Sequence, residues 1–346
     1  MKSPVKILIT FHLAPELVNN IRSVDENLEI LYDPTLLGTP RYLNDQHGEP
    51  INRSKEEEDK FRQMMAKAEV LFGYVPQGYQ ADVKKWFPKL RWNQSTSAGI
   101  GWGAKRYNWT DTDIVFTTAS GIHETPLAEF CIMSMLMYVK DYFWMEEEKA
   151  RKHWARTCST ELRGKTLAII GLGKVGREIA RIAKCMGMRV IATKRHTEGV
   201  DPNSVSVDEI YPWNSLDTLL RESDFLTLIC PETEETRGLI GRNEFSKMKR
   251  GALLINIARG SIVDEDALIE ALRSGHLGGA ALDVFRVEPL PPDSPLWDMP
   301  RVIISPHSAS TADTENMKQT DLFIYNLKRY LKGEPLKNVL NKSLLY

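Results

Sequence analysis

Three side chains with acid–base or anion-binding chemistry lie in the last third of this 346-residue sequence: Arg259, Glu288 and His307. An arginine can hold the carboxylate or carbonyl of a 2-keto acid through two parallel N–H donors, which fixes the orientation of the acid. A histidine can give a carbonyl oxygen its proton as a hydride arrives, and take the proton back in the reverse direction. A carboxylate beside the histidine favours its charged form. These residue types therefore suit hydride transfer to a 2-keto acid.

Each of these residues also has an ordinary structural explanation. A buried arginine is usually an ion-pair partner, and a lone histidine after a strand is more often structural than catalytic. A glutamate before a proline is usually a loop residue. The three residues can form a catalytic set only if they face the same crevice. The secondary-structure elements that carry them therefore decide between the catalytic and the structural interpretation.

Arg259, Asp283 and His307 each lie at or just past the carboxyl end of a predicted strand. The three strands are predicted at residues 253–257, 278–284 and 302–305. Strand and helix patterns alternate along the chain, which is typical of a parallel sheet with helices on both faces. If these strands share one sheet, the residues at their carboxyl ends face the same crevice. Glu288 follows Asp283 closely, in a loop stiffened by prolines.

A glycine-rich turn adds a second kind of chemistry. Thr166–Ile170 is a run of strand formers, followed at once by Gly171-Leu172-Gly173-Lys174-Val175-Gly176 and then by apolar residues at helical spacing. Gly171 allows a tight turn, Gly173 lets the backbone approach a pyrophosphate, and Gly176 lets the helix pack close to the strand. The helix start offers N–H groups to a phosphate. In this strand–turn–helix context the motif predicts dinucleotide binding; by itself it would indicate only a glycine-rich turn.

Two loops in the first third of the chain are candidates for substrate contact. Residues 73–78 and 97–101 end strands predicted at residues 69–74 and 90–96. Loops in these positions line the ligand crevice of open parallel sheets, although an ordinary βα turn would look the same in the sequence. A long helix is predicted at residues 125–141, where it could bridge two domains. The amphipathic stretch that follows it, with Trp144 and Trp154, is a candidate subunit contact.

Composition limits the other functions. The formal net charge is −1, which gives no footprint of nucleic-acid or acidic-membrane binding. The longest apolar run, at residues 131–139, is far shorter than the ~20 residues of a membrane span, and the N-terminus does not resemble a signal peptide. The four cysteines lack metal-ligand spacing, which predicts free or buried thiols in a reducing compartment and no metal site. We therefore expect a soluble cytoplasmic protein.

These motifs, in this order, resemble the D-isomer-specific 2-hydroxyacid dehydrogenases. The resemblance is strong over residues 162–309, and over the first 120 residues it rests on architecture and the Ser-Ala-Gly loop. The matching segments are the glycine turn and residues 256–265 (NIARGSIVDE), 278–285 (GGAALDVF), 288–291 (EPLP) and 305–307 (SPH).

The resemblance implies an α/β fold of two Rossmann-like, doubly wound parallel-sheet domains, with the nucleotide domain inserted into the substrate domain. Residues 1–122 and 312–346 would form the flavodoxin-like substrate-binding domain, and residues 123–311 the dinucleotide-binding domain. The closing helix, predicted at Glu315–Lys332, would return to the first domain. Family members are usually homodimers, so a homodimer is expected.

The resemblance also implies roles for single residues. Arg259 would bind the substrate, His307 would act as acid and base, and Glu288 would pair with His307. The implied cofactor contacts are Gly171, Gly173, Lys174, Val175, Gly176, Lys194, Arg195, Cys230, Pro231, Ala258, Asp283, Ser308 and Ala309, with Asp283 near the carboxamide. The implied substrate contacts besides Arg259 and His307 are Tyr74, Val75, Ala98 and Gly99.

One departure from the family pattern concerns the choice between NAD and NADP. Members that prefer NAD carry an acid at the end of the second strand of the nucleotide domain, where it binds the ribose hydroxyls. Here Lys194, Arg195 and His196 stand there, and the next acid is Glu198. Lys194 and Arg195 would attract a 2′-phosphate, which favours NADP(H) over NAD(H) as the NAD(P) cofactor. The alternative is two solvated surface cations.

The implied function is an NAD(P)-dependent D-2-hydroxyacid dehydrogenase that reduces a 2-keto acid of the glyoxylate or hydroxypyruvate type. A non-catalytic dinucleotide-sensing interaction protein on the same fold is the alternative, because fold alone does not decide function. The complete set of Arg259, Glu288 and His307 favours the enzyme. A formate dehydrogenase is disfavoured, because that relative pairs its histidine with glutamine and Glu288 stands here.

Overall fold

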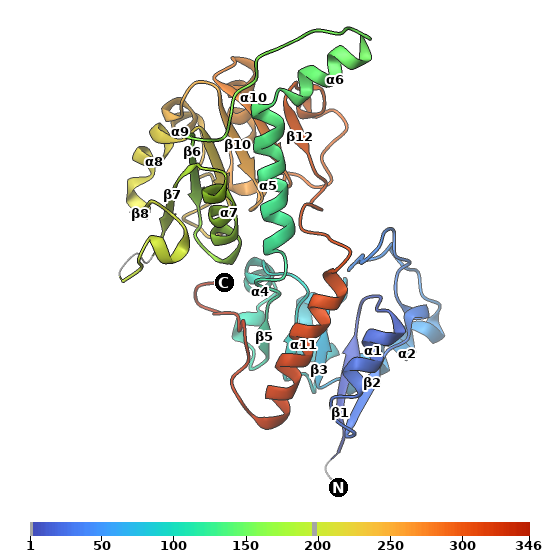
Figure 1. The fold of residues 1–346 in the computed structure, drawn as a ribbon. Coiled ribbons are helices and arrows are strands. Elements are labelled where there is room, and N and C mark those ends of the chain that lie inside the picture. The colour runs from blue at the N-terminus through green and yellow to red at the C-terminus, as the bar shows by residue number, and fades with distance from the viewer. Residues whose placement is uncertain (1–2, 196–198) are drawn as a thin grey trace. The chain divides into compact units, whose positions relative to one another are not determined.

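The structure is a computed structural model that describes residues 3–195 and 199–346, and it divides into two compact units (Figure 1). Unit 1 consists of Met1–Ile122 and Thr311–Tyr346, and unit 2 is the segment His123–Ser310 between them. Thr311 falls in unit 1, one residue from the expected boundary, on the segment that leads into the closing helix.

Unit 1 is built on a parallel sheet with the strand order β2-β1-β3-β4-β5. Its central strands are short runs of apolar residues, and they are buried because helices cover both faces. The strands are β1 (Val5–Ile9), β2 (Leu28–Leu31), β3 (Val70–Phe72), β4 (Trp92–Gln94) and β5 (Val115–Thr117). The helices are α1 (Pro15–Arg22), α2 (Lys55–Lys67), α3 (Val83–Trp86), α4 (Gly101–Arg106) and α11 (Glu315–Lys332).

Two hydrophobic clusters fix the layers of unit 1. On one face, α1 and α11 pack on the sheet, and Phe323 of α11 stacks on Phe72 of β3 with ring centroids 4.1 Å apart. On the other face, Phe61 and Met65 of α2 and Ala104 of α4 are buried against the sheet. The closing helix thus belongs to unit 1, as the resemblance implied.

Unit 2 is built on a larger parallel sheet with the order β12-β11-β10-β9-β6-β7-β8. The strand order reverses direction at β6, the first strand of the unit, which is the arrangement of a doubly wound sheet. The strands are β6 (Thr166–Ile170), β7 (Arg189–Lys194), β8 (Glu209–Pro212), β9 (Phe225–Leu228), β10 (Ala252–Asn256), β11 (Leu277–Leu282) and β12 (Val302–Ile304). The helices are α5 (Glu124–Val139), α6 (Tyr142–Ala150), α7 (Lys174–Cys185), α8 (Leu216–Glu222), α9 (Arg242–Lys247) and α10 (Glu265–Arg273).

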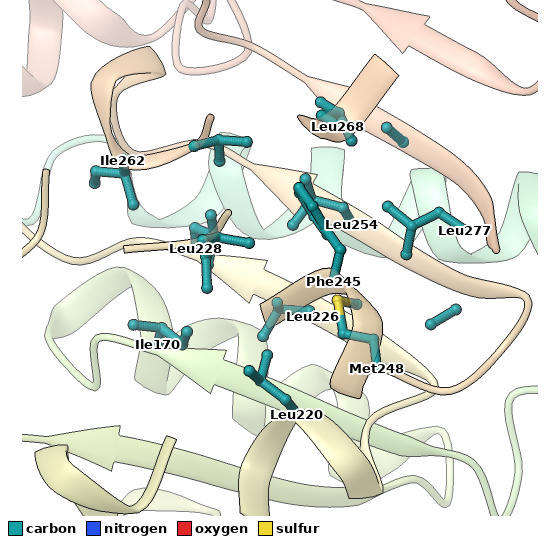
Figure 2. Close-up of a cluster of buried hydrophobic side chains, with 14 of the residues drawn as sticks. Ile170, Leu220, Leu226, Leu228, Phe245, Met248, Leu254, Ile262, Leu268 and Leu277 are labelled. Atoms are coloured by element: carbon teal, nitrogen blue, oxygen red, sulfur yellow. The ribbon is translucent and has the colours of Figure 1, made fainter. Parts of the chain in front are cut away.

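Helices cover both faces of this sheet. On one face, α5 and α7 bury side chains such as Met135 and Ile179 against it. On the opposite face, α8, α9 and α10 contribute Leu220, Phe245 and Leu268 to a second cluster (Figure 2). In Figure 2 these helix side chains point toward Leu226, Leu228 and Leu254 of the central strands. Burial on both faces explains why the strands read as nearly continuous apolar runs.

The predicted α/β class with two parallel sheets is confirmed, although details of single elements differ. Asp283 was expected within a strand, but β11 ends one residue earlier, at Leu282. Strand β8 was not predicted, because its residues are only half-buried or exposed and end in a proline, as suits the edge of a sheet. None of the helices among the described residues combines the length and apolar character that a membrane crossing needs.

Candidate active site

The predicted site residues of unit 2 lie at one edge of its sheet. The glycine turn follows β6, and Arg195 follows β7. Arg259, Asp283 and His307 follow β10, β11 and β12, which are neighbours in the sheet. All these strands pair in parallel, so their carboxyl ends share one edge, and the condition for a common crevice is met.

The glycine turn has the shape that a pyrophosphate needs. Gly171 has φ +110°, and a Cβ there would lie 2.7 Å from the backbone nitrogen of Cys230. A Cβ at Gly176 would lie 2.3 Å from the carbonyl oxygen of Gly171, so only glycine lets α7 pack this close to the turn. At Gly173, by contrast, no heavy atom lies within 4 Å of a Cβ, which leaves room for a ligand to approach the backbone.

The start of α7 also has the electrostatics of an anion site. Lys174 is its first residue, its first turn contains no acid, and Gly173 at the N-cap offers no capping side chain. The charge of a lysine at a helix N-terminus is repelled by the positive end of the helix dipole. A bound phosphate would be attracted by both the lysine and the dipole. Val175 is half-buried against the α5–α7 cluster and holds the turn in place. These residues fit a dinucleotide.

Arg259 is positioned by its own loop. The amide of Asn256, the last residue of β10, donates to the carbonyl of Arg259 (3.2 Å) and accepts from the backbone N–H of Ala258 (3.1 Å). The guanidinium of Arg259 donates from Nη1 to the carbonyl of Ala258 (2.6 Å). Next to it, a Cβ at Gly260 would lie 2.0 Å from the carbonyl carbon and oxygen of Phe285. The glycine therefore lets the loop of Arg259 contact the loop that leads to Glu288.

Glu288 and His307 are brought together, as the sequence predicted. His307 Nδ1 lies 2.8 Å from Glu288 Oε2, and Glu288 Oε1 accepts from the backbone N–H of Phe285 (3.0 Å). Burial acts most strongly on the pKa of Glu288 and raises it. The hydrogen bonds from His307 and Phe285, with the charges of His307 and Arg259, outweigh burial and leave the pKa below its usual value. The carboxylate thus stays charged beside the imidazole.

The backbone at His307 is held in an uncommon conformation. Its φ is +54°, in the left-handed region that costs a non-glycine residue about 1 kcal/mol or more. Its N–H donates to the carbonyl of Asp283 (3.0 Å), and the Asp283 carboxylate accepts from Ser305 Oγ (2.7 Å) and from the N–H of Ala309 (2.9 Å). Burial raises the pKa of Asp283 in spite of these bonds. Asp283 therefore organises the loop that carries His307 and Ser308.

The residues that follow β7 and β9 lie farther along the same edge of the sheet. Burial raises the pKa of Cys230 to about 12, so this thiol is an unreactive packing group behind Gly171. Pro231 and Ala258 follow β9 and β10. Arg195 forms an ion pair with Glu235, with Nη2 and Oε2 2.6 Å apart, which the sequence did not predict. His196 and Glu198 lie outside the described residues.

The candidate substrate loops belong to unit 1. Tyr74 and Val75 follow β3; the ring of Tyr74 stacks on His47 at 4.5 Å, and its carbonyl accepts from Thr10 Oγ1 (2.9 Å). Ala98 and Gly99 follow β4 and are exposed, and the N–H of Gly99 donates to Ser97 Oγ (3.2 Å). Both loops are thus hydrogen-bonded within unit 1.

Comparison with known proteins agrees with this geometry. The family model "D-isomer specific 2-hydroxyacid dehydrogenase, NAD binding domain" matches residues 132–309. The chain is 36% identical to a glyoxylate reductase from Aeropyrum pernix over 245 residues. This alignment covers 68% of this chain and 72% of that protein. The chain belongs to the D-isomer-specific 2-hydroxyacid dehydrogenase family.

Solved structures of dehydrogenases resemble the whole chain. A D-isomer specific 2-hydroxyacid dehydrogenase from Xanthobacter autotrophicus, in complex with NADPH and MES, has a TM-score of 0.79 at 25% identity and covers 100% of both chains. An NADPH-dependent glyoxylate/hydroxypyruvate reductase from Sinorhizobium meliloti, in complex with NADP and sulfate, has a TM-score of 0.76 at 26% identity and also covers 100% of both. The dehydrogenase described here is thus an oxidoreductase with an NAD-binding domain.

Sequence reasoning did not predict the contacts that four groups make with the candidate site residues: Asn256, Gly260, Glu235 and the backbone N–H of Phe285. Asn256 and Gly260 flank Arg259, and a polar residue at a strand end followed by a glycine could have marked that turn. Nothing in the sequence links Glu235 to Arg195 before the strand order is known. Phe285 acts through its backbone, which residue type does not reveal.

Proposed function

We propose that this dehydrogenase reduces a 2-keto acid of the glyoxylate or hydroxypyruvate type to the D-2-hydroxy acid with NAD(P)H. The observation that carries the proposal is the His307–Glu288 hydrogen bond on a loop next to that of Arg259. The name of the Aeropyrum pernix relative supports the substrate class. In this proposal unit 2 binds the dinucleotide and unit 1 supplies the substrate loops at Tyr74–Val75 and Ala98–Gly99.

His307 acts as the acid in reduction. Its Nδ1 is engaged with Glu288, so Nε2 is the ring nitrogen that donates the proton to the carbonyl oxygen of the keto acid. The nicotinamide, when bound, supplies the hydride. Glu288 stabilises the positive charge on the imidazole before the proton leaves and fixes the orientation of the ring. In the oxidative direction Nε2 takes the proton back.

Arg259 orients the keto acid. The bond from Nη1 to the carbonyl of Ala258 restrains the guanidinium, and a guanidinium is suited to hold a carboxylate or carbonyl through parallel hydrogen bonds. Orientation matters because hydride transfer needs the carbonyl carbon in a defined position, and misplacement by ~1 Å can cost about a hundredfold in rate.

The cofactor preference proposed is NADP(H). Lys194 and Arg195 supply two cations where NAD-preferring enzymes carry an acid, and phosphate groups pair strongly with arginine. The Xanthobacter autotrophicus structure that resembles this chain holds NADPH. We also propose a homodimer with α6 and the segment after it in the contact, because Tyr142 and Met145 of α6 are exposed, as is Trp154 beyond its end, to 95%.

The alternative considered from the sequence, a non-catalytic dinucleotide sensor, is disfavoured. It would need the glycine turn but neither an acid–base pair nor a left-handed histidine. The Glu288–His307 bond and the φ of His307 favour the enzyme, since strained residues cluster where chemistry is done.

Initial rates test the proposal. NADH and NADPH are each combined with glyoxylate, hydroxypyruvate, pyruvate, phenylpyruvate and a branched 2-keto acid. We expect turnover with the small polar keto acids, faster at low cofactor concentration with NADPH. A protein that binds NADPH, seen by fluorescence titration, yet oxidises it with none of these acids would contradict the enzyme and support the sensor.

A further inference from the structure

The Arg195–Glu235 ion pair joins two loops beside the glycine turn. In the sheet, β6 lies between β7 and β9. Arg195 is the residue after β7, and Glu235 lies in the turn that follows β9. The pair therefore joins the two loops on either side of the strand that ends in Gly171, the place where a doubly wound sheet binds its nucleotide.

The turn that carries Glu235 is well fixed. Thr236 is buried, and its hydroxyl donates to the carbonyl of Pro231 (2.8 Å) and accepts from the N–H of Thr233 (2.7 Å). Nearby, Glu232 accepts from Ser261 Oγ (2.6 Å) and pairs with Arg237 (2.9 Å), which anchors the base of the turn. The backbone of Glu235 thus has a defined position opposite Arg195.

The side chains of the pair are exposed, by contrast with this backbone. The side chain of Arg195 is 36% exposed and that of Glu235 is 64% exposed. An exposed ion pair of this kind contributes little to stability, so another anion can replace the carboxylate at little cost. A carboxylate and a phosphate offer an arginine the same chemistry, namely oxygen acceptors spaced for two parallel N–H donors.

We propose that Glu235 is a specificity-determining residue that competes with the 2′-phosphate of NADP(H) for Arg195. The inference rests on the proposed cofactor site at Lys194 and Arg195. NADP(H) replaces the carboxylate as the partner of Arg195, whereas NAD(H) leaves the ion pair in place. Lys194 and Arg195 alone would give a larger preference for NADP(H) over NAD(H). Glu235 reduces that preference, because its carboxylate competes with the 2′-phosphate for Arg195 and repels the charge of the phosphate.

Binding of the adenosine half alone tests this without turnover. Calorimetry gives the Kd of adenosine 2′,5′-bisphosphate and of 5′-AMP for the wild type, Glu235→Gln and the control Glu234→Gln, a neighbouring exposed acid. We expect Glu235→Gln to bind the bisphosphate about three- to fivefold more tightly, with 5′-AMP unchanged and the control equal to wild type. The gain should shrink in 0.5 M salt, which screens exposed charges.

Two results would overturn the inference. Equal or weaker bisphosphate binding by Glu235→Gln would mean that Glu235 does not compete. Equal binding of bisphosphate and 5′-AMP by all three proteins would mean that Arg195 does not read the 2′-phosphate. Neither result touches the proposed reaction, because keto-acid reduction with NADH measured on the same preparations depends on Arg259, Glu288 and His307.

Discussion

The two ends of the carboxyl edge of the unit 2 sheet are built in different ways. At the end formed by β10, β11 and β12, backbone hydrogen bonds from neighbouring loops hold Glu288 and His307, and Gly260 permits a contact that no other residue could make. At the end formed by β7 and β9, exposed charges meet in an ion pair. We infer that chemistry is fixed by geometry at one end and that cofactor choice is tuned by weak charges at the other.

The largest effect is expected at His307. His307→Ala removes the proton donor, so kcat/KM for keto-acid reduction should fall by a factor of about 10² to 10⁴, the usual contribution of a general acid. Fluorescence titration with NADPH serves as the control, because the glycine turn is unchanged. A decrease in kcat/KM of less than tenfold would show that His307 is not the proton donor, and the two ends of the sheet edge would then not differ in the way described.

Gly260→Ala should come next. The new Cβ would need space occupied by the carbonyl group of Phe285, so the loops of Arg259 and Glu288 must move apart. We expect kcat/KM to fall by about a hundredfold, the order reported for ångström-scale misplacement of a bound group. Gly103→Ala is the matched control, since nothing lies within 4 Å of its Cβ. Equal activity of the two variants would show that this end tolerates movement.

Glu288→Gln should change the pH dependence more than the maximum rate. The lowered pKa of Glu288 means that the wild-type pair keeps its carboxylate at neutral pH and loses it only as the pH falls below the usual glutamate range. Glutamine cannot take up a proton there, so the fall of kcat/KM for reduction on the acid side, which follows protonation of Glu288 in the wild type, should be absent in the variant. An unchanged profile would mean that Glu288 is only a structural partner.

The smallest effect is expected at the adenosine end. The double variant Lys194→Asp with Arg195→Ala should weaken NADPH by about tenfold and NADH far less, because only NADPH carries the 2′-phosphate. The measurement is the Kd of each cofactor. Equal losses for both would identify Lys194 and Arg195 as solvated surface cations and would leave no tuning at this end.

The sequence predicted what depends on local pattern. Apolar runs located the central strands, because residue periodicity reflects the local secondary structure. The glycine spacing after Ile170 located the turn that follows β6, because that turn needs backbone conformations that favour glycine. The pairing of Glu288 with His307 was implied by the family resemblance, and the hydrogen bond between them agrees with it.

What the sequence could not show depends on contacts between distant segments. Arg195 and Glu235 are 40 residues apart, and their loops become neighbours only through the strand order β7-β6-β9. The role of Asp283 in holding His307 acts through a backbone carbonyl, which any residue type possesses. The half-buried edge strand β8 lacks the apolar run that marks the central strands.

The central claim is that His307, held by Glu288, delivers the proton in a stereospecific reduction. The most direct measurement is chiral chromatography of the glycerate formed from hydroxypyruvate and NADPH, with wild type and His307→Ala side by side. We predict D-glycerate alone from the wild type and a rate reduced by at least about a hundredfold in the variant. L-glycerate from the wild type, or equal rates of D-glycerate formation by both proteins, would contradict the account.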